Sequence, residues 1–455
     1  MSQEKKSNED VIVKLQHLLK SGKRTLNHYP LLLESALIVK EACAAANGEV
    51  GAISQDKARL IESVCQSLRQ NIKAVDCPIN INRNLCAPLN LAVAELIVRE
   101  ASKQSKTLTF EDILTNQADA DVTATVKVLT VAKAIEPLLE AGFDFIDLMK
   151  TKAQEFNDVV KTSRASLRDG LPVCLGDEFE GYACTMKEAL GRLSTERSLW
   201  KVSALGLGEA GTGLGSTRAF QIKANEALSR ISGIKFEEPH NAFLALDGAH
   251  NLVLAHAHLQ AIALVLWRTG HDLGLMCSGP RGGIREIAFP AVAPGSSIMP
   301  GKVNPTVAEL AMLVADNVLS NSWAATLSVH SGWLGTTPTS SLALRTFMDS
   351  TELLTRTLHV FGEKVIQGIT AYPERCLKQA QSSLALVHAL DYFVDKEDRE
   401  KVLNKASSED LSIIQAAKIL HVLPDSVLDD VLDPKHLINR EAVESMLKRH
   451  TAILK

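Results

Sequence analysis

Apolar residues recur at three- and four-residue spacing along most of the 455-residue chain, which is the pattern of amphipathic helices. Shorter stretches with this spacing cover residues 11–19, 54–70 and 90–101. Longer stretches cover residues 121–161, 176–205, 241–273, 305–328 and 340–366. These long stretches would form helices of about 25–40 residues, well above the average globular helix. Alternating strand patterns are essentially absent, so the sequence predicts an all-α fold around a bundle of long helices.

Segments rich in Gly, Pro, Ser and Thr separate the long helical stretches. These segments cover residues 163–175, 206–217, 278–304 and 331–339. Beyond Gly368 the helical stretches become short. We therefore expect three domains, with boundaries near residues 108 and 366. They are an N-terminal helical domain (1–108), a central long-helix bundle (109–366) and a small C-terminal helical domain (367–455).

Composition and charge narrow the class of protein. The net charge is −4, which argues against nucleic acid or a membrane surface as partner, since either favours a strong basic patch. The most apolar region, 251–276, is interrupted by His256, Arg268 and His271, so we expect a buried core helix rather than a membrane span. The N-terminus resembles neither a signal nor a transit peptide, which favours a cytoplasmic protein. The eight cysteines show no zinc-ligand spacing, and we expect no metal site.

One region between the helical stretches has an unusual composition. It is the segment GSSIMPGKVNP at residues 295–305. Asn304 followed by Pro305 is typical of a helix start. The N-terminus of a helix presents free N–H groups and a partial positive charge, and Lys302 adds a full positive charge. This combination suits a carboxylate, and it would lower the pKa of a nearby hydroxyl such as Ser296. From the residues alone, an ordinary helix cap with an incidental lysine stays an open alternative.

The same segment resembles the signature loop of the fumarase/aspartase superfamily, in the form carried by its class II fumarase and aspartase branch. Three further segments resemble other family motifs: SGPRGGIREIAFPAV (278–292), RASLRDGLP with LGDEF (164–172 and 175–179), and GTGL (211–214). The likeness extends from about residue 75 to residue 450, and it is weaker at both ends.

The resemblance implies a three-domain helical subunit in a homotetramer with a twenty-helix core, each active site being assembled from three subunits. It also implies a cofactor-free anti-elimination on a succinyl-type substrate, giving fumarate or a substituted fumarate. In the family the first signature serine is the base, which is Ser296 here. Lys302 and Asn304 would stabilise the resulting aci-carboxylate anion, and Glu309 would support the loop.

Two substrate-contacting segments of the family differ in this chain. The family's GSGTxxNMNVNE aligns with residues 84–95, where only Asn90, Val93 and Glu95 coincide and the hydroxyl donors are lost. The family's SQSSNDxFPT aligns with residues 116–125, and its Ser-Ser-Asn becomes Ala-Asp-Ala at residues 118–120. The carboxylate of Asp119 would repel a dicarboxylate through like charge.

A third segment differs as well. The family's Thr-His or Thr-Gln pair is Ala165-Ser166 here, and the glycine-rich turn is two residues shorter, which brings Glu209 close to the expected substrate position. Arg168 stands where the family has Gln or Met, and Arg83 precedes the altered first segment. An arginine fork suits a carboxylate, although an ordinary surface or interdomain role is the alternative for both.

Three interpretations of the function remain open. We expect a lyase of altered specificity; the alternatives are a catalytically silent scaffold and an ordinary fumarase or aspartase whose lost contacts are replaced elsewhere. Asp119 and Glu209 favour a substrate with an amine or guanidinium group, or none at all. The residues expected to contact the substrate are Ser166, Arg168, Thr212, Asp119, Ser297 and Met299.

Overall fold

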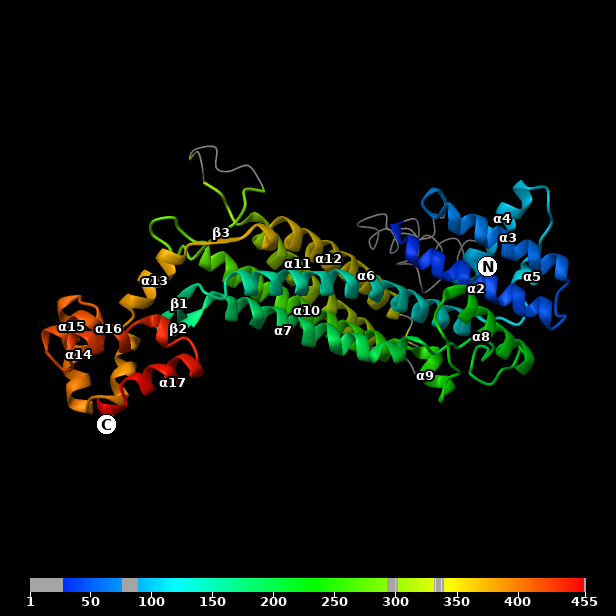
Figure 1. The fold of residues 1–455 in the computed structure, drawn as a ribbon. Coiled ribbons are helices and arrows are strands. Elements are labelled where there is room, and N and C mark those ends of the chain that lie inside the picture. Colours follow the sequence, from blue (N-terminus) through cyan, green and yellow to red (C-terminus); the bar gives the residue numbers. More distant parts are fainter. Residues whose placement is uncertain are drawn as a thin grey trace, which may run out of the picture. The chain divides into compact units, whose positions relative to one another are not determined.

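The computed structural model describes residues 28–75, 89–292, 299, 302–330, 332, 337 and 339–453. Over this part of the chain the fold is predominantly helical, which confirms the predicted all-α class (Figure 1). The chain divides into two compact units. Unit 1 comprises Met1–Glu140, Ala189–Ala263 and Ala315–Thr355. Unit 2 comprises Ala141–Glu188, Leu264–Val314 and Arg356–Lys455.

The helices up to the signature segment are α2 (Pro30–Glu49), α3 (Gln55–Gln70), α4 (Leu89–Lys103), α5 (Phe110–Leu114), α6 (Asp119–Glu155), α7 (Leu175–Thr195), α8 (Arg218–Ser232), α9 (Ala242–Asp247) and α10 (Ala249–Met276). Those after it are α11 (Thr306–Val329), α12 (Ser340–Lys364), α13 (Pro373–Ser382), α14 (Lys396–Glu409), α15 (Ile413–Ile419), α16 (Asp425–Val431) and α17 (Arg440–Arg449). The described strands are β1 (Val160–Ala165), β2 (Arg168–Cys174), β3 (Ile287–Ala288) and β4 (Thr370–Ala371), which form the antiparallel pairs β1–β2 and β3–β4.

In unit 1, α2 is a buried helix that packs against α3 and α8. It begins at Pro30, whose fixed φ suits the first helical position, and it is buried on nearly every face. Segments of α10, α11 and α12 also meet in this unit through His256. The Nε2 of His256 donates to the Ala343 carbonyl at 3.0 Å, and its Nδ1 lies 3.3 Å from Ser322 Oγ. Burial lowers the pKa of His256, so this ring is a neutral core histidine.

In unit 2, aromatic and glycine contacts hold the long helices together. Phe145 of α6 stacks on Phe361 of α12 with ring centroids 6.0 Å apart. Phe156, just after α6, meets the edge of Phe179 of α7 at 5.2 Å. A Cβ on Gly270 of α10 would lie 3.1 Å from the Ala308 carbonyl oxygen of α11, so these two helices approach closely. The close packing fixes α10, which supplies one wall of the cavity described below, against α11, which follows the signature segment.

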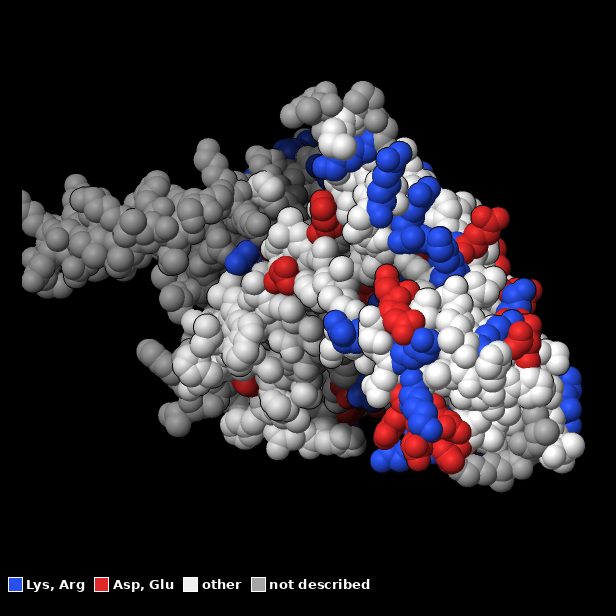
Figure 2. All heavy atoms as spheres, turned by 90° about the vertical axis from the view of Figure 1, so that its left-hand side faces the viewer, with Lys and Arg blue, Asp and Glu red and all other residues white. Residues whose placement is uncertain are grey.

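The C-terminal helices α14 to α17 surround a core of their own. Its buried side chains include Leu390, Val402, Ile413, Leu428 and Met446. The outward face of α14 carries ion pairs such as that of Lys401 with Glu397 and Asp398. Acidic and basic side chains accordingly lie side by side on the face shown in Figure 2. Exposed pairs of this kind contribute little to stability, so the apolar core is what holds these helices.

The structure corrects several predicted helix bounds. The stretch 121–161 ends as a helix at Glu155, because β1 begins at Val160, and the break predicted at 163–175 contains most of a β-hairpin. The stretch 176–205 ends as a helix at Thr195. The stretch 241–273 is split at Gly248, whose φ of 57° places it in the left-handed region that ends α9.

Two other predictions remain predictions. The predicted helix at residues 11–19 lies outside the described residues. The division into three domains near residues 108 and 366 stays a prediction.

Helix α10 is long and apolar enough to cross a membrane by length and composition alone, with a mean hydropathy of 1.4 in its most apolar window. However, it carries the buried His256 and the ion-paired Asp272. It also contacts α11 at Gly270 and α7 at Tyr182. These polar and packing contacts are those of a core helix, as the sequence predicts.

Two glycines of α7 provide a test of the packing between α6 and α7. A Cβ on Gly176 would lie 2.3 Å from the Ala153 carbonyl oxygen, whereas one on Gly191 meets nothing within 4 Å. We expect Gly176→Ala to destabilise the protein by about 1–3 kcal/mol, because the backbone of α6 must move. Gly191→Ala, the matched control, should leave stability unchanged or raise it by up to about 1 kcal/mol. Urea unfolding measures both; equal stability of the two variants would contradict this account of the α6–α7 contact.

Candidate active site

The signature segment leads directly into α11, which begins at Thr306. Ser296 and Ser297 lie outside the described residues. The side chains of Lys302 and Asn304 are exposed just before the helix, and the N–H of Lys302 donates to the Met299 carbonyl at 3.1 Å. A cation and an amide are therefore exposed beside the positive end of the α11 dipole.

The helix starts one residue later than the sequence predicts. The Pro305 carbonyl accepts the first helical hydrogen bond, from Glu309 N–H at 3.0 Å, so Pro305 precedes the helix rather than opening it. Glu309 lies exposed in the first turn, where a carboxylate is favoured by the dipole. Burial, and after it the charge of Glu309, raises the pKa of Cys277. Glu309 is therefore electrostatically close to the end of α10.

The β1–β2 hairpin carries two of the predicted substrate contacts. Ala165 pairs with Arg168, so Ser166 and Leu167 form a two-residue turn. Both have positive φ, 51° and 61°, as the type I′ turns favoured in such hairpins require. Ser166 lines a cavity of about 750 Å³ in unit 2, whereas Arg168 is exposed and is not among its lining residues. The hairpin thus brings Ser166, but not Arg168, to a ligand-sized space.

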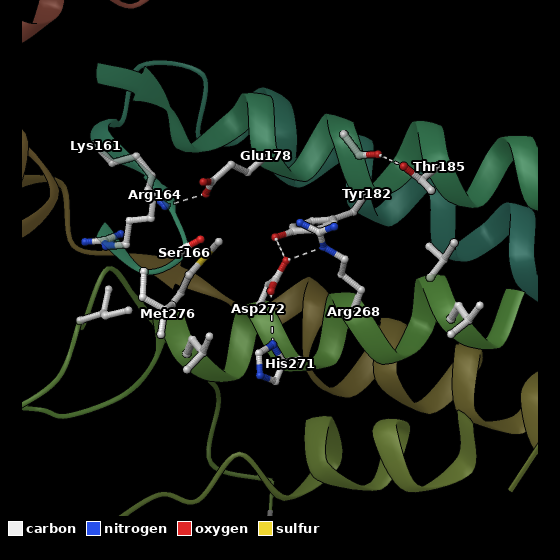
Figure 3. Close-up of a pocket in the computed structure, with 16 residues that line it drawn as sticks. Lys161, Arg164, Ser166, Glu178, Tyr182, Thr185, Arg268, His271, Asp272 and Met276 are labelled. Atoms are coloured by element: carbon white, nitrogen blue, oxygen red, sulfur yellow. Dashed lines mark hydrogen bonds and ion pairs between the residues drawn. The ribbon is translucent and has the colours of Figure 1, made fainter. Parts of the chain in front are cut away.

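The walls of this cavity come largely from α7 and α10, and Asp272 is the point where their polar groups meet (Figure 3). Tyr182 of α7 donates its hydroxyl to Asp272 Oδ2 at 3.1 Å. Arg268 Nε donates to the same oxygen at 3.2 Å. His271 Nδ1 lies 3.4 Å from Asp272 Oδ1. Burial raises the pKa of Tyr182, so this hydroxyl stays a donor.

At the hairpin end of the cavity lies a buried ion cluster. Lys161 Nζ is 2.6 Å from Glu178 Oε2 and 2.7 Å from Glu286 Oε2. Arg164 Nη1 is 2.6 Å from Glu286 Oε1, and its Nη2 donates to Gln379 Oε1 of α13 at 3.3 Å. Two cations and two carboxylates balance one another, which is what buried charges require. The cluster fixes β1 to the segment that leads toward the signature loop.

In unit 1, carboxylates gather at the N-terminus of α6. Asp121 accepts hydrogen bonds from the N–H groups of Ala118, Gly206 and Gly208 at 3.0–3.2 Å. Glu209 Oε2 accepts from Ala120 N–H at 3.3 Å. The glycine-rich turn is therefore fixed to the helix start, and Glu209 lies beside the residues that flank Asp119. Part of this clustering of carboxylates is explained without a ligand, because carboxylates at a helix N-terminus accept hydrogen bonds from its free N–H groups.

Behind these carboxylates lies Lys40 of α2, which is buried. Its Nζ donates to Asn90 Oδ1 of α4 and to Gln117 Oε1 at 2.8 Å. Burial lowers the pKa of Lys40 to about 8, while the charges of Asp119 and Asp121 act in the opposite direction. Lys40 thus connects α2 to two segments aligned with the family's substrate-contacting loops.

The predicted site residues fall into both units. Asp119 and Thr212 belong to unit 1, where Thr212 Oγ1 accepts from Leu214 N–H at 3.3 Å in the glycine-rich turn. The others that the structure describes belong to unit 2: Ser166, Arg168, Met299, Lys302, Asn304 and Glu309.

Five polar residues of these clusters were not predicted as site residues from the sequence: Lys40, Asp121, Tyr182, Arg268 and Asp272. A lysine inside the apolar stretch of α2 was the one visible signal, since an unpaired buried lysine is rare.

Comparisons with known proteins identify the family. A family profile described as Lyase matches residues 13–320. Aspartate ammonia-lyase from Pseudomonas canavaninivorans is 31% identical over 426 residues, covering 91% of this chain and 89% of that protein. Class II fumarate hydratase from Nitrosomonas europaea is 30% identical over 432 residues, covering 91% and 94%.

Among solved structures, the fumarate lyase:delta crystallin from Brucella melitensis matches with a TM-score of 0.87. It is 30% identical to this chain and covers 91% of it, with 92% of its own chain matched. The chain therefore belongs to the fumarase/aspartase superfamily and is a lyase of that type, whose general reaction is an elimination.

Lys40 gives a pH test of the unit 1 cluster. Its pKa in the folded protein, about 8, lies below the ordinary value of 10.5. Between these values the unfolded chain binds more protons, so Lys40 makes the folded state gain stability as pH rises. The stability of the wild type relative to Lys40→Met should therefore increase by on the order of 2–3 kcal/mol between pH 7.5 and 10.

Urea unfolding over that pH range measures this difference, and Lys103→Met, which removes an exposed lysine, is the control. The slope of the difference is the test, because Lys40→Met also leaves two acceptors without their donor. A difference that stays constant with pH would rule out a buried, titrating Lys40.

Proposed function

We propose that this lyase carries out a cofactor-free anti β-elimination on a succinyl-type substrate, cleaving a C–N or C–O bond. The product is fumarate or a substituted fumarate. The observation that carries the proposal is the exposure of Lys302 and Asn304 immediately before the N-terminus of α11. Exposed polar groups in a segment that leads into a core helix support a role in meeting a ligand rather than in packing.

The chemistry assigns each group a task. The Ser296 oxygen removes the proton from Cβ, and the electron pair of that bond is delocalised onto the neighbouring carboxylate as an aci-carboxylate. This dianion needs preorganised positive charge and donors. Lys302, Asn304 and the α11 N-terminus supply them. The double bond between Cα and Cβ then forms as the leaving group departs with its electron pair, and Glu309 supports the loop from the first turn.

Six residues are proposed to contact the substrate: Ser166, Arg168, Thr212, Asp119, Ser297 and Met299. We further propose a homotetramer with shared active sites, located in the cytoplasm. Support for assembly comes from large apolar side chains of α11 that stay exposed in the single chain: Leu310, Leu313, Trp323 and Leu327, between 48% and 66% exposed. Such surfaces usually mark an interface.

The leaving group is proposed to carry an amine or guanidinium. Glu209 accepts a hydrogen bond from Ala120 N–H, the residue after Asp119, which supports a concentration of negative charge where the family has uncharged donors. A cationic group would be attracted there, and a further anion repelled.

Loss of the base tests the mechanism. A panel of succinyl derivatives, with amine, guanidinium or hydroxyl leaving groups, is incubated with the protein and fumarate formation is followed by ultraviolet absorbance. Ser296→Ala should reduce the turnover of whichever substrate reacts by about 10²–10⁴-fold, because a positioned base contributes that much. Ser408→Ala, on an exposed face of α14, should retain full activity. Unreduced turnover by Ser296→Ala, or no turnover of any panel member by the folded wild type, would refute the proposal.

The proposed leaving group has its own test. Asp119→Asn should raise KM about tenfold for substrates with an amine or guanidinium leaving group, the effect expected from losing one charge contact. It should leave KM for a hydroxyl-bearing substrate unchanged or lower. Asp425→Asn, at an exposed helix start in unit 2, is the control. Good turnover of a neutral or purely anionic substrate that Asp119→Asn does not impair would contradict the proposed leaving group.

A further inference from the structure

Arg268 occupies a particular place in the cavity of unit 2. It projects from α10 into the space that is also lined by Ser166 (Figure 3). Its Nε is held by Asp272 at 3.2 Å, and its side chain is 76% exposed in the single chain. The two terminal Nη groups meet no acceptor among the residues that the structure describes. The fork of this guanidinium therefore faces open space.

The other cations that line the cavity in the described part of the chain are already committed. Lys161 is shared between Glu178 and Glu286. Arg164 is divided between Glu286 and Gln379. An incoming anion that used either cation would have to break a buried ion pair, which is costly. Arg268 could accept an anion without losing its bond to Asp272, because that bond uses Nε alone.

Asp272 is itself fixed from a second helix. Tyr182 of α7 donates its hydroxyl to the same Oδ2 that holds Arg268. His271, which stacks on Trp267 with ring centroids 4.9 Å apart, lies against the other carboxylate oxygen. An exposed ion pair between residues i and i+4 of a helix usually contributes little to stability. Here the carboxylate is held independently of the arginine, so the guanidinium is oriented before any ligand arrives.

We propose that Arg268 is a carboxylate-binding residue of this cavity and that Asp272 is the positioning residue that presents its fork. The inference rests on the proposed function for the class of ligand, a substrate with a succinyl group. The carboxylate comes from the succinyl group itself or from a substituent on it. Both are bound by the same bidentate geometry, and the volume of about 750 Å³ accommodates either.

The experiment measures equilibrium binding by calorimetry, so that it does not depend on turnover. The probes are succinate, with two carboxylates, and tricarballylate, with three. Arg268→Met should weaken binding of the recognised probe by at least about 10- to 100-fold, the loss expected for a single charge-assisted hydrogen bond. Arg268→Lys, which keeps the charge without the fork, should lose less affinity. Arg192→Met is the matched control, since Arg192 is an exposed arginine of α7 outside the cavity lining.

Asp272→Asn separates positioning from structure. It should weaken the same probe by a smaller factor than Arg268→Met, and in the Arg268→Met background it should have no further effect, because its contribution to binding acts through Arg268. If Asp272→Asn instead acted through a general loss of folding, its effect on binding would add to that of Arg268→Met.

The outcomes separate the two proposals. Loss confined to tricarballylate assigns Arg268 to a substituent, and loss with both probes assigns it to the succinyl carboxylate; both support the inference. Binding of both probes that is unchanged in Arg268→Met, equally weakened in Arg192→Met, or undetectable in the wild type overturns it. Ser296→Ala should bind the probes as the wild type does, so failure of the elimination proposal leaves this result unaffected.

Discussion

The structure depends on one constraint: a charge removed from water in a helical protein has to be matched by an opposite charge or by hydrogen bonds. In unit 2, Lys161 and Arg164 meet Glu286, whose side chain is fully buried. That match places the β1–β2 hairpin against the segment before the signature loop. In unit 1, Asp121 performs the equivalent task with backbone N–H groups, and it holds the glycine-rich turn at the start of α6. The elements nearest the candidate site are thus set by polar matching, whereas the long helices are set by apolar packing.

This distinction explains how much could be predicted from the sequence. Apolar periodicity reports the face that a helix buries, so the expected helix at 54–70 matches α3 almost residue for residue. Periodicity carries no information about polar partners far apart in the chain, such as Tyr182 and Asp272. A hairpin turn filled by Ser-Leu also lacks the usual Asn-Gly signal, so β1 and β2 were missed.

The candidate site could likewise be predicted only in part. The motif at 295–305 could be recognised, because its residues are adjacent in the sequence. Family membership then follows from similarity along 91% of the chain. The altered segments were visible as lost hydroxyl donors, but the polar contacts that these segments make in the fold were not. Lys40 reaches Asn90 and Gln117 from α2, a helix buried on nearly every face and therefore without the periodicity that would have predicted it. Such contacts are decided by three-dimensional proximity, to which a single sequence gives no access.

The two-residue turn of the hairpin has a consequence for engineering. Positive φ at Ser166 and Leu167 is strained for both residues, and Leu167 is two-thirds exposed, so packing does little to compensate. A thermostabilisation campaign would replace this pair with Asn-Gly. The same change would delete the hydroxyl that lines the cavity. Thermal tolerance and ligand contact therefore compete for the same pair of positions, and a library selected only for heat resistance would drift away from the activity.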